Sequence, residues 1–199
     1  PCVSLDNQHL LTHCRYKPPP GQKLSRFATC FLIRYLYSGA GRFLITSFHH
    51  LPPADPAFIE VFPPLIKPKV QKLEPTPGEH ALVYLRGGNS AGFVERLKGG
   101  RRRFHIYGLG KRPSQGNLVF KKTSEDEFLA DLASCRYVIG NGGHSLLSEA
   151  LYLGKPILCL PIFFFYEHYF NAYFVKKNGL GDYLWDIACR RDFIQDFED

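Results

Sequence analysis

The stretch from residue 136 to 181, RYVIGNGGHSLLSEALYLGKPILCLPIFFFYEHYFNAYFVKKNGLG, decides the fold of this chain. Its first apolar run, Val138–Gly140, ends in Asn141-Gly142-Gly143, where glycines permit a sharp turn and a close backbone approach to a ligand. We expect Ser145 to cap a helix, whose free N–H groups and positive dipole end suit a phosphate. Ile157–Leu160 predicts a buried strand, followed by an aromatic loop and a second helix. The order strand, glycine turn, helix, strand is typical of half a nucleotide-binding α/β domain.

Several fixed positions in this block resemble a family signature. G-G-x-S-x-x-x-E is followed by G-x-P, by another proline, by an acidic residue next to histidine, and by N-A. The pattern resembles the donor-binding block of GT-B glycosyltransferases, most closely that of the bacterial peptidoglycan GlcNAc transferase of family 28 and related uncharacterised bacterial enzymes. It is also similar to the signature box of plant and animal UDP-sugar transferases. The resemblance implies a UDP-sugar as donor substrate and no cofactor.

In these families the glycine turn holds the donor diphosphate, the helix glutamate holds the ribose, and an acidic-plus-glutamine pair holds the sugar. By position the resemblance assigns the ribose to Glu149 and the sugar to Glu167 and His168. The diphosphate falls to the turn and helix start, namely Asn141, Gly142, Gly143, His144 and Ser145. Two positions depart from the pattern, because His168 replaces the usual glutamine and Asn141 replaces the histidine of the plant box. At a helix start we expect His144 to be neutral, either donating to the ligand or packing.

A regular alternation of strands and helices begins at His80 and indicates a doubly wound, Rossmann-like parallel sheet. The predicted strands, about five, are Ala81–Leu85, Phe104–Tyr107, Leu118–Phe120, Tyr137–Gly140 and Ile157–Leu160. The helices between them include Phe93–Leu97 and Ser124–Ser134, the latter with a capping box of Ser124 and Glu127. Right-handed crossovers place all the turns that follow the strands on one rim.

A second glycine turn on that rim extends the predicted diphosphate site. Gly87 and Gly88 follow the first strand of the alternation and would offer backbone N–H groups to the same anion. By position in the fold, the neighbouring strand end predicts a base pocket formed by Phe120, Lys121 and Lys122, although Phe120 also suits a core position. The aromatic run Phe163–Tyr166 would line the sugar site, face an acyl chain, or pack in the core.

Residues 1–60 differ from the rest and predict a remnant of an N-terminal acceptor domain with its linker, before a C-terminal domain of residues 61–199. A strand at Cys2–Leu5 leads into Asp6-Asn7-Gln8-His9, and Ile59–Ile66 is interpreted as an extended linker strand. In the peptidoglycan transferase the matching strand also ends in an acidic and amide cluster. By that analogy Asp6 and His9 are the candidates for catalysis, with a hydrogen-bonded loop as the alternative.

Composition narrows the class of protein further. The 199 residues are 45% hydrophobic, enough for a substantial core. They contain no methionine, so we expect either a piece of a longer protein or a sequence from which modified methionines are missing. No apolar run approaches the roughly 20 residues of a membrane span. The six cysteines form no C-x-x-C pair, which favours reduced thiols in the cytoplasm. The net charge of +7 and the run Arg101–Arg103 favour either a solvated turn or contact with an anionic membrane.

Together these patterns predict a glycosyltransferase that moves a hexosamine or hexose from a UDP-sugar to a hydroxyl on a lipid or polysaccharide acceptor. The chain has no Asp-x-Asp and no histidine or cysteine spacing typical of zinc, so we expect no metal. The cytoplasmic side of the cell envelope is the expected location. A UDP-sugar epimerase of the same architecture and a non-enzymatic nucleotide- or glycan-binding module remain open. Nucleic acid is not an expected partner, because no basic–aromatic motif accompanies the charge.

Overall fold

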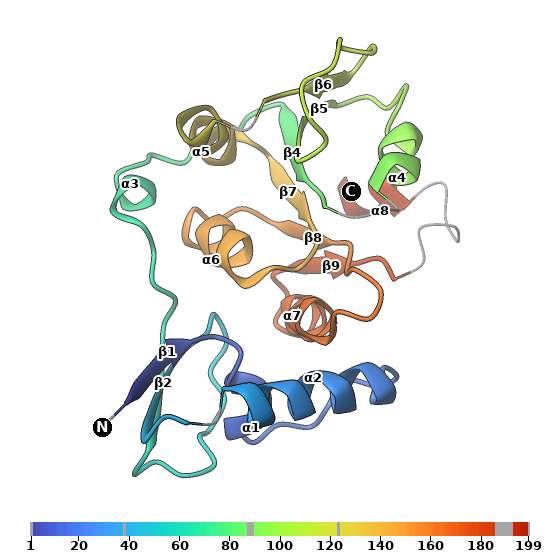
Figure 1. Ribbon diagram of the computed structural model, residues 1–199. Helices are drawn as coiled ribbons and strands as arrows, with labels where there is room; N and C mark the ends of the chain where they lie inside the picture. The colour runs from blue at the N-terminus through green and yellow to red at the C-terminus, as the bar shows by residue number, and fades with distance from the viewer. Residues whose placement is uncertain (1, 38, 87–89, 123, 186–192, 199) are drawn as a thin grey trace.

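The computed structural model describes residues 2–37, 39–86, 90–122, 124–185 and 193–198, and these form two parallel sheets. A three-stranded sheet has the order β1-β2-β3, and a six-stranded sheet has the order β6-β5-β4-β7-β8-β9. Figure 1 shows the two sheets as separate layers of the molecule, joined by the extended segment that carries α3 (Pro68–Gln71). We refer to residues 2–62 as the N-terminal unit and to residues 68–198 as the C-terminal unit.

The N-terminal unit is a small parallel sheet with helices between its first two strands. It comprises β1 (Val3–Asp6), α1 (Leu10–His13), α2 (Lys23–Leu36), β2 (Arg42–Thr46) and β3 (Ile59–Phe62). Within the predicted linker strand Ile59–Ile66, residues Ile59–Phe62 form β3 and pair with Phe43–Thr46 of β2. The prolines that follow, Pro63 and Pro64, end this strand, since proline offers no N–H to a ladder.

The C-terminal unit is a doubly wound α/β domain, as predicted. Its strands are β4 (His80–Tyr84), β5 (Arg103–Tyr107), β6 (Leu118–Phe120), β7 (Tyr137–Gly140), β8 (Ile157–Cys159) and β9 (Gly181–Tyr183). Its helices are α4 (Ser90–Arg96), α5 (Glu125–Ser134), α6 (His144–Tyr152), α7 (Tyr166–Lys177) and α8 (Phe193–Glu198). Starting at β4 the order runs outward to β6 and then restarts at β7, which is the doubly wound pattern with a switch point between β4 and β7.

The sixth strand, β9, was missed from the sequence because it is only three residues long and lacks an apolar run. Its pairing with β8 depends on Gly181, where an added Cβ would lie 1.8 Å from the carbonyl oxygen of Ile157. A glycine at such a close backbone approach gives little periodic signal, so sequence patterns do not reveal the strand.

Two apolar clusters cover the faces of the large sheet. One joins Leu82 and Val138 to α5, α6 and α7, and the other joins Val83 and Ile139 to α4 and α8. Alternate residues of β4 and β7 therefore point to opposite faces, as strand geometry requires. The result is a three-layer α/β/α arrangement, which fixes the ends of β4 and β7 beside each other (Figure 1).

Helix α7 connects the two units, because it contributes to both cores. Ala172 and Val175 pack on the large sheet, whereas Tyr166, Phe170 and Phe174 pack with Leu10, Ile45 and other buried residues of the N-terminal unit. Two hydrogen bonds add to this contact: the hydroxyl of Tyr169 donates to the Pro20 carbonyl at 2.7 Å, and Ser25 Oγ donates to the Phe164 carbonyl at 2.8 Å. The N-terminal unit is thereby placed against the start of α7.

Two helix starts differ from the sequence expectation. Helix α6 has Gly143 as its N-cap, so Ser145 lies inside the first turn and is exposed instead of capping. Helix α5 has Ser124 at its N-cap as predicted, but its side chain makes no capping hydrogen bond, so the capping box is not formed. In both helices the first-turn N–H groups have no side-chain cap.

Candidate functional site

The glycine turn after β7 lies at the switch point of the large sheet and directly against the start of α7. Gly142 has φ of +92°, and an added Cβ would lie 2.6 Å from the backbone oxygen of His168. Gly143 is close to the same residue, because its Cβ position lies 3.9 Å from His168 Nε2. The structure therefore brings together residues predicted for the diphosphate (Gly142, Gly143) and for the sugar (His168).

Two asparagine side chains hold this turn in place. Asn141 Oδ1 accepts from the backbone N–H of Arg86 at 2.7 Å, and Asn141 Nδ2 donates to the Leu160 carbonyl at 3.0 Å. One amide thus ties together the segments that follow β4, β7 and β8. From α7, the buried Asn171 donates to the Gly142 carbonyl at 2.9 Å. The Asn141 amide is therefore engaged in supporting the turn, and any contact with a ligand at this point falls to backbone groups.

The start of α6 offers unpaired donors beside the turn. Its N-cap Gly143 has no side chain, and neither Ser145 nor any other first-turn residue is acidic. The first N–H groups of a helix have no partner within the helix, and together with the helix dipole they favour an anion. His144 is the first residue of the helix, and Ser145 is exposed above it. This arrangement suits a phosphate group at the carboxyl ends of the strands.

Three buried polar atoms around the turn have no hydrogen-bond partner among the described residues. They are His144 Nδ1, His168 Nδ1 and Asn171 Oδ1. Burial lowers the pKa of His144 to about 4 and also lowers the pKa of His168, so both rings are neutral near pH 7. Unpaired buried polar groups are costly and rare, so their concentration at one place indicates a site that a polar ligand completes.

Glu149 lies on α6 one turn beyond these groups and is nearly buried, with 8% of its surface exposed. Its Oε1 atom lies 3.6 Å from Nζ of Lys67, in the segment that joins the two units. Lys67 also lies 3.5 Å from Glu125 at the start of α5. The predicted ribose contact is thus a carboxylate with one ion-pair partner, and that partner is largely exposed.

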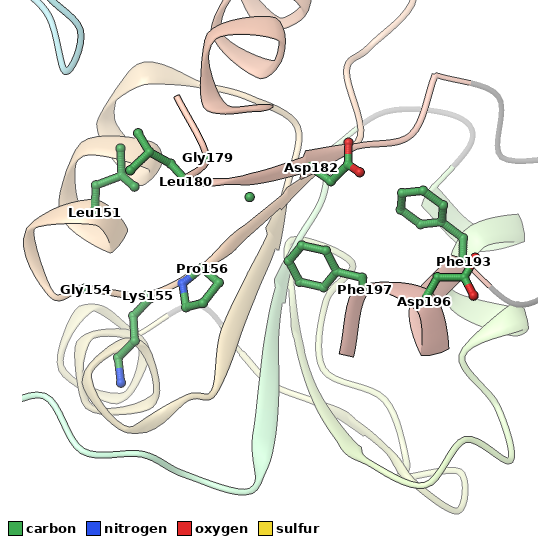
Figure 2. Close-up of a pocket in the computed structure, with 11 residues that line it drawn as sticks. Leu151, Gly154, Lys155, Pro156, Gly179, Leu180, Asp182, Phe193, Asp196 and Phe197 are labelled. Carbon is green, nitrogen blue, oxygen red and sulfur yellow. The ribbon is translucent and has the colours of Figure 1, made fainter. Parts of the chain in front are cut away.

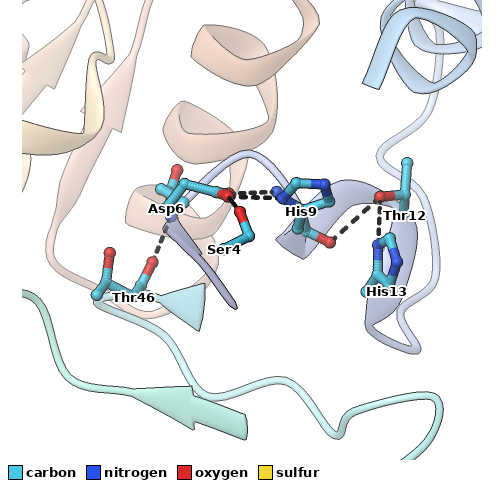
Figure 3. Close-up of polar contacts among 7 residues, drawn as sticks. Ser4, Asp6, His9, Thr12, His13 and Thr46 are labelled. Atoms are coloured by element: carbon cyan, nitrogen blue, oxygen red, sulfur yellow. Dashed lines mark hydrogen bonds and ion pairs between the residues drawn. The ribbon is translucent and has the colours of Figure 1, made fainter. Parts of the chain in front are cut away.

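Asp6 and His9 form a hydrogen-bonded pair at the end of β1 (Figure 3). Asp6 Oδ2 lies 2.6 Å from His9 Nδ1, and Asp6 also accepts from Ser4 Oγ at 2.5 Å and from the His9 N–H at 2.9 Å. Burial raises the pKa of Asp6, but the hydrogen bonds from His9 and Ser4 outweigh it and lower this pKa to about 2. His9 is only 2% exposed, so Asp6 is the more accessible member of the pair.

The negative charge of Asp6 also acts on Glu167 of the C-terminal unit. Burial raises the pKa of Glu167, and the negative charge of Asp6 raises it further. Glu167 is in the first turn of α7, next to His168. The fold thereby places a carboxylate of the N-terminal unit near the predicted sugar residues of the C-terminal unit, which the sequence alone treated as separate clusters.

The predicted base residues lie at the end of β6 and have partners of their own. Lys121 Nζ lies 2.7 Å from Asp131 Oδ2, which also accepts from the hydroxyl of Tyr107 at 2.6 Å. Phe120 is buried at 7% exposure in the core cluster, and Lys122 is exposed. Gly87 and Gly88, predicted to contact the diphosphate, lie outside the described residues.

Three potential metal ligands also gather near Lys121. Atoms of His80, His105 and Asp131 lie within 4.8 Å of one another. The rings of His80 and His105 stack with centroids 4.0 Å apart, and Asp131 already balances the positive charge of Lys121. This group therefore forms a buried polar network between α5 and the sheet, and the ammonium group beside its carboxylate disfavours a divalent cation.

Sequence reasoning missed two residues that contribute to this region, Asn171 and His49. Asn171 was noted only as part of the N-A pair, and its contact with Gly142 depends on where α7 packs. His49 follows β2, and its ring stacks on Phe174 of α7 with centroids 4.2 Å apart. Burial lowers its pKa to about 4, with smaller effects from His144 and Lys177, and its Nε2 has no partner among the described residues. The only sequence signal was its position after an apolar strand.

A hollow of about 600 Å³ lies near the amino-terminal ends of strands β8 and β9, away from the glycine turn (Figure 2). It is lined by residues that precede β8 and β9, such as Pro156 and Leu180, and by Phe193 and Phe197 of α8. Open α/β sheets bind ligands beyond the carboxyl ends of their strands, and this hollow is at the amino ends. We therefore place the candidate site at the glycine turn and not in this hollow.

The fold defines a class: an α/β protein with a doubly wound domain and a glycine turn at the switch point of its sheet. Comparison with known families makes this specific, because the sequence profile of glycosyl transferase family 1 matches residues 1–198. The chain belongs to this family, and the GT-B resemblance is confirmed. The closer likeness to family 28 remains a resemblance. A search of curated proteins finds no match.

Solved structures with the same fold are GT-B glycosyltransferases. They include the glycotransferase of kitacinnamycin (15% identity, TM-score 0.59, 80% of this chain and 46% of that chain). They also include the spinosyn forosaminyltransferase SpnP (17% identity, TM-score 0.55, 92% of this chain and 54% of that chain). A third is Arabidopsis thaliana UGT89C1 complexed with UDP-L-rhamnose (15% identity, TM-score 0.57, 92% of this chain and 51% of that chain). The chain spans about half the length of these structures. Among the described residues, no helix is long and apolar enough to cross a membrane.

Proposed function

We propose that this chain binds a UDP-sugar at the Gly142–Gly143 turn and takes part in transferring its hexosamine or hexose to a hydroxyl acceptor on a lipid or polysaccharide. One observation carries the proposal: buried atoms of His144, His168 and Asn171 that have no partner within the described part of the chain lie near an uncapped helix start at the switch point of the sheet. The family match and the fold shared with a UDP-L-rhamnose complex support it.

Each part of the donor has a proposed partner. The diphosphate lies on the N–H groups of the turn and of α6, with His144 and Ser145 beside it, and Gly87 and Gly88 remain contacts predicted from the sequence alone. The ribose hydroxyls donate to Glu149, whose carboxylate is nearly buried. The sugar contacts Glu167 and His168 at the start of α7. The base is proposed to lie near Phe120, Lys121 and Lys122, where the Asp131 ion pair fixes Lys121.

Departure of the diphosphate is the step that these groups favour. Negative charge grows on the leaving oxygen, and donors fixed in advance stabilise it better than mobile solvent does. The α6 dipole and the turn amides supply such donors, so we propose a metal-independent transfer. The lowered pKa values of His144 and His168 keep both imidazoles neutral, and a neutral imidazole can donate one hydrogen bond to the leaving diphosphate.

Asp6 and His9 are the proposed catalytic pair on the acceptor side. Transfer to a hydroxyl requires removal of its proton, and a general base works best when its pKa is near the operating pH. A pKa of about 2 favours Asp6 as the acceptor of a hydrogen bond that orients the hydroxyl, with His9 as its positioning residue. As the bond from the acceptor oxygen to the sugar forms and the sugar–phosphate bond breaks, the hydroxyl proton passes to the departing diphosphate. The cytoplasmic side of an anionic membrane is the proposed location, where a lipid or glycan acceptor of the cell envelope is available.

Calorimetric titration with UDP, GDP and dTDP tests the proposal, followed by a panel of UDP-sugars with acceptor present. We expect saturable UDP binding that is at least tenfold weaker in Gly142→Ala and is also weakened in Glu149→Ala. A chain that binds none of the three nucleotides contradicts the proposal. Interconversion of UDP-sugars without transfer would favour an epimerase, and UDP binding without turnover by the protein would favour a binding module.

A further inference from the structure

Helix α2 presents an aromatic face to the solvent. Phe27, Phe31 and Tyr35 are 69%, 56% and 76% exposed, and Leu24 at the helix start is 68% exposed. Their spacing of three and four residues places them on one side of the helix. The Phe27 and Phe31 rings stack at 6.2 Å and the Phe31 and Tyr35 rings at 5.8 Å. Exposed apolar patches of this kind mark interaction surfaces.

The charges beside this face are all positive. Lys23, Arg26 and Arg34 follow the same helical spacing on its flank, and the sequence of α2 contains no acidic residue. Each of the three is exposed, and none forms an ion pair with a carboxylate of the described chain. A groove of about 620 Å³ is lined by these three cations, by the three aromatic residues and by Leu11 and Cys30.

A second exposed aromatic segment is attached to this helix. Phe163, Phe164 and Phe165 are 72%, 49% and 59% exposed, and the carbonyl of Phe164 accepts from Ser25 Oγ of α2 at 2.8 Å. This loop leads directly into Glu167 and His168, the proposed sugar contacts. The hydrogen bond from Ser25 holds the loop against α2, and the Phe165 ring stacks on that of His168 with centroids 5.4 Å apart, so the loop links the helix to the candidate site.

We propose that this surface, made of the α2 face and the loop 163–165, docks the protein on an anionic lipid membrane. Aromatic and leucine side chains enter the interface of a bilayer, while lysine and arginine on the flank attract acidic headgroups. Charge complementarity selects this occupant, because the patch combines aromatic rings with cations that have no carboxylate partner among the described residues, and a bilayer is anionic at its surface and apolar beneath. The proposal does not depend on the identity of the donor sugar.

Vesicle binding by the full chain tests the proposal. The probes are vesicles of phosphatidylcholine alone and vesicles with added phosphatidylglycerol, measured by co-sedimentation. Trp185 is the only tryptophan and lies 6.4 Å from the Phe163 ring, so its quenching by brominated acyl chains reports on the loop. We expect binding to the anionic vesicles that weakens with ionic strength, and quenching of Trp185 on binding.

Paired variants separate this surface from other exposed residues. Phe27→Ser with Phe31→Ser, and separately Arg26→Glu with Arg34→Glu, should each lower the affinity for anionic vesicles about tenfold or more. Matched controls carry the same changes elsewhere: Phe58→Ser, at 56% exposure, and Arg101→Glu with Arg103→Glu. We expect the controls to bind like the parent chain, and UDP affinity to be equal in all of these variants.

Several outcomes would overturn the proposal. Absence of vesicle binding by the parent, or equal binding by the α2 variants, contradicts it. Loss of binding only in the Arg101 and Arg103 variant would transfer the contact to that run. A parent dimer that dissociates on changing Phe27 and Phe31, without vesicle binding, would show that a second copy of the chain covers the face.

Discussion

Replacing Gly142 with alanine should disrupt both the fold and the proposed donor site. An alanine there must adopt a φ near +92°, which costs about 1–2 kcal/mol for a residue with a Cβ. Its Cβ would also lie 2.6 Å from the backbone oxygen of His168, where no flexible side chain can move away. Overpacking of this kind costs about 1–3 kcal/mol, so the free energy of unfolding should fall by about 2–5 kcal/mol in all.

Two other glycines provide matched controls. Gly154 has φ of +67° but nothing within 4 Å of an added Cβ, so Gly154→Ala should cost only the backbone term of about 1–2 kcal/mol. Gly143 as N-cap has φ of −69°, and its Cβ would be 3.9 Å from the nearest atom, so Gly143→Ala should be tolerated.

The assays are urea denaturation for stability and calorimetric titration with UDP for the site. We expect Gly142→Ala to be the least stable of the three variants and to bind UDP at least tenfold more weakly than Gly154→Ala, because relief of the clash displaces the start of α7. Equal stability and equal UDP affinity in Gly142→Ala and Gly154→Ala would refute the reasoning.

Glu149, Lys155 and two buried histidines each give a further testable prediction. Glu149→Ala should weaken UDP binding by about 1–3 kcal/mol in calorimetry, whereas Glu125→Ala, which removes the other partner of Lys67, should not. Lys155→Met should lower the free energy of unfolding in urea by about 1–3 kcal/mol or more, because Nζ donates at 2.8 Å to two carbonyls that would lose their partner. Burial lowers the pKa of His49 and His144 from 6.5 to about 4. The unfolded chain therefore binds more protons than the folded chain between pH 6.5 and about 4. The free energy of unfolding is not reduced by these two histidines above pH 6.5, and it falls below that pH by about 1.4 kcal/mol per pH unit for each histidine. Denaturation curves at several pH values should show this fall, and His49→Asn should make it shallower; an unchanged slope would contradict the assignment.

The alternation of the C-terminal unit could be predicted because its strands are apolar runs bounded by turns. Tyr137–Gly140 and Ile157–Cys159 are buried throughout, as parallel strands require. The small sheet was harder, since Pro63 and Pro64 next to β3 suggested a linker, and pairing with β2 depends on residues distant in sequence. Local patterns do not carry that information.

The candidate site shows the same limit. The glycine turn and the first turn of α6 were predicted from local chemistry, but the hold of Asn171 on Gly142 and the nearness of Asp6 to Glu167 arise only when α7 packs between the two units. Lys121 was predicted from its place after a strand, and its ion pair with Asp131 needs the position of α5. Contacts between side chains of different helices and strands could therefore not be predicted from the sequence, because they depend on how these elements pack.

Hydrogen–deuterium exchange with and without UDP tests the central claim most directly, because it locates the bound nucleotide on the chain. The account predicts slower exchange in the turn and first turn of α6, residues 142–147, and at the start of α7, residues 166–170. Protection confined to residues 179–182 and 193–197, which line the hollow at the amino-terminal ends of the strands, would contradict it.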